Sequence, residues 1–112
     1  MTLHIPENLY FHGFECSSYP NPKKQFNTEK IRKTMQLINK YCQHTQTIRK
    51  DIGSYSLKHI IEKHFADNYL SNGELIVAML NCGFDYKKEH VDSPNCYFNV
   101  SKKSIRELND NL

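Results

Sequence analysis

Six histidines and four cysteines are the side chains of this sequence that could support metal or nucleophilic chemistry. His12 and Cys16 are four residues apart, and Cys42 and His44 are two apart, so these four could in principle hold a zinc ion. Their spacing fits none of the recurrent zinc-ligand pairs, and the sequence has no C-x-x-C pair. We therefore expect neither a metal nor another cofactor.

Catalytic motifs are equally sparse. No flanking motif supports a cysteine nucleophile, and the four glycines do not form the cluster that a phosphate-binding loop needs. The acidic residues are scattered, so spacing pairs none of them for general acid–base work. The sequence favours a binding protein over an enzyme, with a small hydrolase or nuclease as the weakest alternative.

Length and cysteine usage indicate one domain in a reducing compartment. The chain has 112 residues, no apolar run near the roughly 18 that a membrane span needs, and no signal-peptide layout in its first residues. The four cysteines form no tight framework, although disulfides are formally open. We expect reduced thiols in a cytoplasmic protein, with Cys42 and Cys82 as small core residues on apolar helix faces.

Positive charge is concentrated in the middle of the chain. The net charge is +3 with a pI near 8.6, and eight of the fifteen basic residues lie between positions 23 and 50, where Glu29 is the only acid. Dedicated nucleic-acid binders usually have a pI above about 9. A solvated surface therefore competes with a phosphate-binding one, for which the candidates are Lys23, Lys24, Lys33, Lys40, Lys87 and Lys88.

Aromatic residues are abundant near the N-terminus. The chain has seven Tyr, six Phe and no Trp, and the segment 9–14 alone carries three of these rings. Next to a basic stretch, such a segment could anchor a protein partner or stack nucleobases. The alternative that we favour is that it packs onto the domain, because small domains need such cover.

Three helices are predicted to position these residues. Apolar residues recur at helical spacing from Thr28 to about His44, and a second helix begins at Ser54 or Ser56. A third begins with the capping box Ser71-Asn72-Gly73-Glu74 and ends near Gly83. This third helix is apolar almost all round, which predicts that it lies at the centre of the fold.

The C-terminal third changes period. Segments 84–86 and 96–100 alternate or are rich in strand formers, so we predict an antiparallel hairpin with Lys87 and Lys88 in or near its connection. Ser101 would cap a last short helix carrying Ile105, Leu108 and Leu112. The fold class is α+β: a three-helix core with a C-terminal β-hairpin in a winged-helix-like order. Residues 1–27 form an irregular arm, and 28–112 form one helical domain.

The winged-helix order would make the third helix a DNA-recognition helix. Such a helix needs polar, preferably cationic, side chains near its start to reach base edges. The candidate offers Asn72 and also carries Glu74, which phosphates repel. A DNA-binding transcriptional regulator is therefore the alternative, not the first expectation.

The segments 53–59, 69–78, 83–84 and 94–99 read GSYSLKH, YLSNGELIVA, GF and PNCYFN. Together they resemble a pattern found in small, mostly uncharacterised accessory proteins of bacterial plasmids, phages and integrative elements, over about half of the chain. The resemblance implies a non-enzymatic protein of a mobile element that binds a bacterial protein or ribonucleoprotein complex. This class includes inhibitors of host defence such as anti-CRISPR proteins.

Some polar residues of the matched segments have no evident task in capping or core packing. These are Tyr55, Lys58 and His59, and they direct attention to the place where the second helix meets Asn72 at the start of the third. A helix N-terminus there could also receive an anion or a partner's carboxylate. The predicted partner-binding residues are Tyr55, Lys58, His59, Asn72, Lys87 and Lys88.

Overall fold

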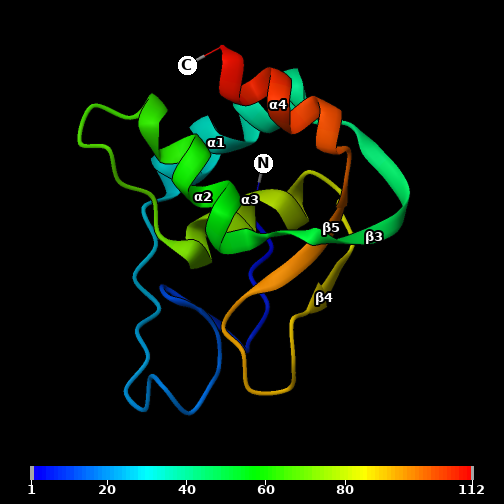
Figure 1. The fold of residues 1–112 in the computed structure, drawn as a ribbon. Coiled ribbons are helices and arrows are strands. Elements are labelled where there is room, and N and C mark those ends of the chain that lie inside the picture. Colours follow the sequence, from blue (N-terminus) through cyan, green and yellow to red (C-terminus); the bar gives the residue numbers. More distant parts are fainter. Residues whose placement is uncertain (1, 112) are drawn as a thin grey trace.

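The computed structural model describes residues 2–111. It is an α+β domain with four α-helices and two small sheets, which confirms the predicted class. The helices and strands follow the chain as shown in Figure 1. Their order is β1 (Leu9–Tyr10), β2 (Gly13–Phe14), α1 (Thr28–Tyr41), β3 (His44–Gly53), α2 (Ser54–Ile61), the short 3-10 helix η1 (Glu62–His64), α3 (Asn72–Asn81), β4 (Tyr86–Lys88), β5 (Cys96–Val100) and α4 (Lys102–Asp110).

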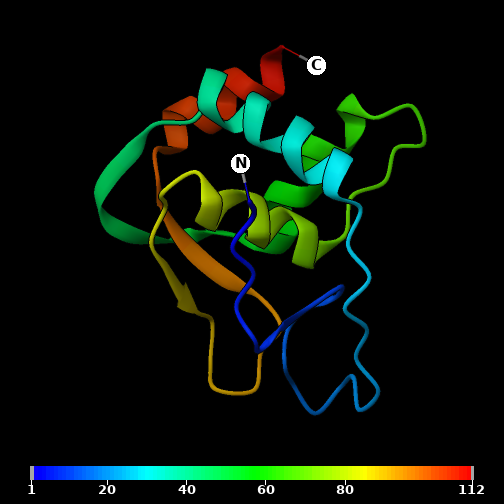
Figure 2. The same cartoon turned by 180° about the vertical axis from the view of Figure 1, so that it is seen from behind.

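Helix α3 lies at the centre, as its nearly uniform apolar sequence predicts. Every residue from Asn72 to Met79 is buried, and the helix packs against α1, α2 and the β2 strand. Both ribbon views show it enclosed between the other helices and the N-terminal segment (Figures 1 and 2). Only the last two residues of the helix, Leu80 and Asn81, are half-buried.

The helix starts follow local capping chemistry. Ser71 Oγ accepts from the Glu74 N–H and the Glu74 carboxylate accepts from the Ser71 N–H, so the predicted capping box is present. Ser101 caps α4 through the Ser104 N–H, also as predicted, whereas Leu112 lies outside the described residues. Helix α1 is capped by Asn27 and ends at Tyr41, three residues before the predicted end.

The sheet contains a strand that the sequence does not reveal. The segment 46–53, expected to be a linker, belongs to the ten-residue strand β3, and the sheet order is β3-β5-β4. Ile52 is the only buried residue of β3, so its sequence lacks the alternation of apolar and polar residues by which most half-buried strands are predicted. The predicted hairpin is present as antiparallel β4 and β5; Lys87 lies within β4, and Lys88 is its last residue, next to the connection.

The N-terminal segment, Thr2 to Asn27, packs on the core as we favoured from the sequence; we call it the arm. Leu9 and Phe14 are fully buried. The arm touches the start of α3 so closely that a Cβ at Gly73 would lie 1.9 Å from Tyr10 O. Gly13 has a φ of +128°, and a Cβ at this position would likewise lie 2.3 Å from Pro94 O. These two glycines permit the contact between arm, α3 and the β4–β5 loop.

Within residues 2–111, no helix combines the length and the apolar character required to cross a bilayer.

Candidate functional site

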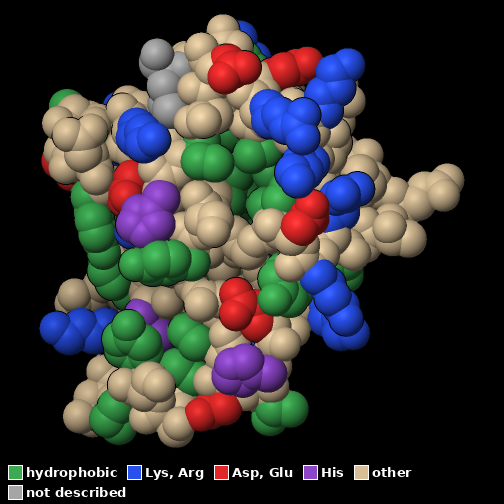
Figure 3. Space-filling model, in the orientation of Figure 1, with side chains coloured by type: hydrophobic (Ala, Val, Ile, Leu, Met, Phe, Trp, Pro, Cys, Tyr) green, Lys and Arg blue, Asp and Glu red, His purple; other side chains and the backbone are tan. Residues whose placement is uncertain are grey.

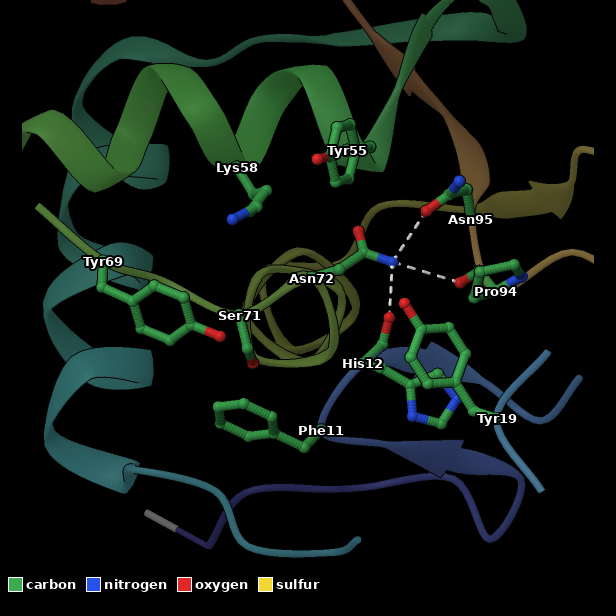
Figure 4. A pocket seen from close by; sticks show the side chains of 10 residues that line it. All are labelled: Phe11, His12, Tyr19, Tyr55, Lys58, Tyr69, Ser71, Asn72, Pro94 and Asn95. Atoms are coloured by element: carbon green, nitrogen blue, oxygen red, sulfur yellow. Dashed lines mark hydrogen bonds between the residues drawn. The ribbon is translucent and has the colours of Figure 1, made fainter. Parts of the chain in front are cut away.

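A pocket of about 380 Å³ opens where the arm, the end of the β4–β5 loop and the facing parts of α2 and α3 meet. Three of its rim residues, Tyr19, Tyr55 and Tyr69, are 49%, 54% and 44% exposed. The full lining, drawn in Figure 4, is Phe11, His12, Tyr19, Tyr55, Lys58, Tyr69, Ser71, Asn72, Pro94 and Asn95. We call this the tyrosine pocket.

Asn72, at the first position of α3, forms the floor of the tyrosine pocket. Its Nδ2 donates to His12 O at 3.1 Å, to Pro94 O at 3.2 Å and to Asn95 Oδ1 at 2.9 Å, which ties α3 to the arm and the β4–β5 loop. Three acceptors around one nitrogen fix the orientation of the amide. Its Oδ1 consequently faces the pocket and, although buried, has no hydrogen-bond partner.

Lys58 forms one wall and is tied to Glu62. The Lys58 ammonium lies 3.1 Å from Glu62 Oε1, and the two side chains are only 10% and 13% exposed. Glu62 also accepts from His59 Nδ1 at 2.7 Å and from the Leu70 N–H at 3.2 Å. Burial alone would raise the pKa of Glu62, but these donors lower it below the usual glutamate value. The positive charge of Lys58 is thus neutralised inside the wall.

Aromatic stacking holds the opposite wall. The ring of His12 stacks on Tyr19 with centroids 4.0 Å apart, and Phe11 stacks on Tyr69 at 6.2 Å. Burial lowers the pKa of His12 below the usual histidine value, so this ring is uncharged at neutral pH. Its Nε2 is a second buried polar atom without a partner. The pocket is therefore aromatic, nearly neutral and incompletely hydrogen-bonded.

The start of α3 is less open to an anion than the sequence suggests. The Gly73 N–H donates to Phe11 O at 3.0 Å, and the Glu74 N–H donates to Ser71 Oγ. The buried Glu74 carboxylate also accepts from the Asn27 N–H at 2.6 Å, which places a negative charge next to this helix start. These contacts remove the donors on which binding of a carboxylate or phosphate would rest.

Three of the six predicted partner-binding residues, Tyr55, Lys58 and Asn72, line the tyrosine pocket. His59 lies just outside the lining, edge-on to the Tyr55 ring at 4.5 Å. Lys87 and Lys88 are on β4, outside the lining, and Lys88 donates to Val91 O. The structure thus brings together the residues around the α2–α3 junction and leaves the two hairpin lysines apart.

The lysines proposed for nucleic acid are distributed over separate elements. Lys23 and Lys24 are on the arm, Lys33 and Lys40 on α1, and Lys87 and Lys88 on β4. Several make contacts within the chain: Lys33 pairs with Glu29 at 3.3 Å, and Lys24 lies over the Tyr10 ring. On the face shown in Figure 3, basic side chains gather at the upper right, over α4 and β3, whereas hydrophobic and histidine side chains gather at the left.

The cysteines are buried or half-buried and unpaired. Burial raises the pKa of Cys42 to about 12 and that of Cys82 to about 11. Cys42 and Cys82 pack against the core, in agreement with the sequence interpretation. Among residues 2–111, no three histidine, cysteine or acidic side chains are grouped closely enough to hold a metal ion.

Seven of the ten lining residues were not among the predicted partner-binding residues. Phe11 and His12 belong to the aromatic segment 9–14, and Ser71, Pro94 and Asn95 lie in the matched segments, where Ser71 was assigned to a cap. Tyr69 is the first residue of a matched segment but was given no role, and Tyr19 carried no signal, because only the folded arm brings it to this pocket.

Comparison with known proteins adds no relative: no protein-family model, no curated protein and no solved structure matches this chain.

Proposed function

We propose that this protein is a non-enzymatic interaction protein that uses the tyrosine pocket to bind a protein partner, as an inhibitor or accessory protein of a phage or other mobile element would. One observation carries the proposal. Of the five exposed large hydrophobic side chains in the described chain, Tyr19, Tyr55 and Tyr69 surround the same pocket. Tyrosine clusters of this kind, with a fully buried floor, are typical of the energetic centre of protein interfaces.

The mobile-element context rests on the resemblance of segments 53–99 and implies a bacterial protein or nucleoprotein complex as the partner. The site itself supports binding more than catalysis. Its lysine is neutralised by Glu62, and its histidine is stacked under Tyr19.

A selection from a displayed random-peptide library tests this function. The immobilised protein should enrich peptides whose binding is lost in the double variant Tyr55→Ala/Tyr69→Ala. Tyr86→Ala is the matched control, because Tyr86 is also exposed and also stacks on one aromatic ring, that of Phe14, but lies outside the pocket. Failure to enrich any peptide, or enrichment that the double variant retains, would contradict the proposal.

A winged-helix DNA-binding protein remains the second candidate, because one observation favours it. Strand β3 lies between α1 and α2, and the order α1, β3, α2, α3, β4, β5 with the sheet order β3-β5-β4 resembles that of winged-helix domains. In that arrangement α3 would enter the major groove. Here α3 is buried and its start is covered by Tyr10 and Phe11, so the proposal of a protein partner ranks first.

A further inference from the structure

We propose that the tyrosine pocket receives an uncharged aromatic group with an N–H donor, the indole of a tryptophan in the partner protein. This inference deepens the proposed function and rests on it. Four features of the pocket define the group that it fits: an unpartnered acceptor, aromatic walls, a neutral charge balance and its size.

The acceptor is Asn72 Oδ1. The residue is 94% buried, and its amide nitrogen is held by three oxygens, so the amide cannot turn to exchange its two ends. Figure 4 shows the oxygen directed away from those partners, into the space beside Tyr55 and Lys58. A buried acceptor without a partner destabilises the protein, and a ligand N–H placed there would restore the missing hydrogen bond.

The walls select a flat group. Tyr19, Tyr55 and Tyr69 stand at the rim with Phe11 below them, and Tyr19 and Phe11 are each braced by a second stacked ring. Rings supported in this way lose little conformational entropy on binding, and aromatic pairs gain energy beyond the area that they bury. A planar side chain can contact several of these rings at once.

Charge excludes the cationic and phosphate-bearing candidates. Lys58 is the one Lys or Arg among the ten lining residues, and it already lies 5.7 Å from the Tyr55 ring centroid and 5.2 Å from that of Tyr69. It occupies the cation–π positions that an arginine or lysine of a partner would use. Because Glu62 neutralises Lys58, no free cation remains for the phosphate of a nucleotide. An uncharged donor is the group that fits.

Indole meets these requirements with a side chain common at interface centres. Its nitrogen donates and never accepts, which matches an acceptor without a partner. Tryptophan is among the residues most enriched at interface hot spots. The pocket volume of about 380 Å³ lies at the lower end of the range for ligand sites and can contain one large side chain.

The absence of tryptophan from the chain makes a direct test possible. N-acetyltryptophanamide is titrated with the 112-residue protein, and its fluorescence anisotropy is followed by exciting the indole where tyrosine does not absorb. We expect saturable binding that weakens at least tenfold in Tyr55→Ala and is unchanged in Tyr86→Ala. The 1-methylindole analogue, which lacks the N–H, should bind about five- to tenfold more weakly. This analogue tests the Asn72 acceptor without replacing Asn72, which would also remove three structural hydrogen bonds.

Competition distinguishes the alternatives. N-acetylargininamide and adenosine 5′-monophosphate should not displace the indole. Displacement by the nucleotide at lower concentration than by N-acetyltryptophanamide itself would overturn the assignment in favour of a nucleobase. If the selected peptides lack tryptophan but still need Tyr55 and Tyr69 of this protein for binding, and no indole binding is measured, the indole assignment is overturned. The proposed protein-binding role would then still stand. If neither peptides nor indole bind, both proposals fail.

Discussion

Replacing Gly73 by alanine should destabilise this protein, although helix propensity alone predicts the reverse. Gly73 is the second residue of α3, and alanine in a helix is favoured over glycine by about 1 kcal/mol. A Cβ at this position would lie 1.9 Å from Tyr10 O and 2.7 Å from Phe11 O. Both atoms are backbone atoms, so the arm itself must move away from α3.

The structure gives the size of the effect. An ordinary contact begins near 3.4 Å, so the arm must shift by about 1.5 Å, which breaks the 3.0 Å hydrogen bond from the Gly73 N–H to Phe11 O. That hydrogen bond contributes about 1 kcal/mol. Release of the fully buried Leu9 and Phe14 would cost about 1.5 to 3 kcal/mol each. With the gain in helix propensity subtracted, Gly73→Ala should lower the free energy of unfolding by about 3 to 6 kcal/mol.

Urea unfolding followed by far-ultraviolet circular dichroism measures this loss. Gly53→Ala is the control, because the one close contact of a Cβ there is with the flexible end of Glu89, at 3.2 Å, and the next neighbours are at an ordinary 4.0 Å. We expect this change to cost less than about 1 kcal/mol. Trypsin should also cleave the variant faster after Lys23 and Lys24 in the loosened arm. A Gly73→Ala protein as stable as the wild type, with an unchanged cleavage rate, would refute the close packing of arm and α3.

Three further predictions concern polar or titratable side chains that are buried or half-buried. The pKa of Glu62 is lowered in the folded state, so its contribution to stability is present above the unfolded glutamate pKa and is lost as the pH falls through the lower folded value. Glu62→Gln should therefore lower the free energy of unfolding by about 1 to 3 kcal/mol at neutral pH and flatten its pH dependence below about pH 5. Urea unfolding midpoints measured over a range of acid pH values would show both effects. Asn99 Oδ1 accepts from the Asp85 N–H at 2.7 Å and its Nδ2 donates to Thr45 O at 3.2 Å, so Asn99→Ala should cost about 1 to 3 kcal/mol in urea unfolding. Because the pKa values of Cys42 and Cys82 are about 12 and 11, iodoacetamide at mildly alkaline pH should label both slowly in the folded protein and rapidly in urea, as followed by mass spectrometry.

Local signals were sufficient to predict the helices. The capping box at Ser71 and Glu74 located the start of α3, and its apolar sequence located that helix in the core. Strand β3 could not be predicted in the same way, because it is an edge strand whose side chains are mostly exposed. Its pairing with β5 is irregular in register, and its existence depends on a partner strand more than 40 residues away.

The site was only partly predictable for a similar reason. Tyr55 was identified because it has no task in the core, and the structure leaves it 54% exposed. Lys58 was selected by the same reasoning, and Asn72 was selected for its place at the start of α3, but both also have structural tasks, in the pair with Glu62 and in the link to the arm. The remaining walls come from residues distant in sequence, such as Tyr19 and Asn95, and no local pattern can bring those together.

Duplex DNA is the partner that the order of the elements suggests and that the packing opposes. A recognition helix must present its first turn to the groove, but Gly73 in that turn donates to Phe11 O and the whole helix to Met79 is buried. The remaining contacts would come from lysines on the arm, α1 and β4, which do not follow one element. We therefore expect a labelled random duplex to bind weakly, with an affinity that is lost at moderate salt and a small salt slope, because each phosphate contact adds about 0.9 to that slope. Tight binding whose logarithm falls with the logarithm of the salt concentration with a slope of several units would show that the arm moves away from α3 when DNA binds. It would make the winged-helix alternative the function of this protein.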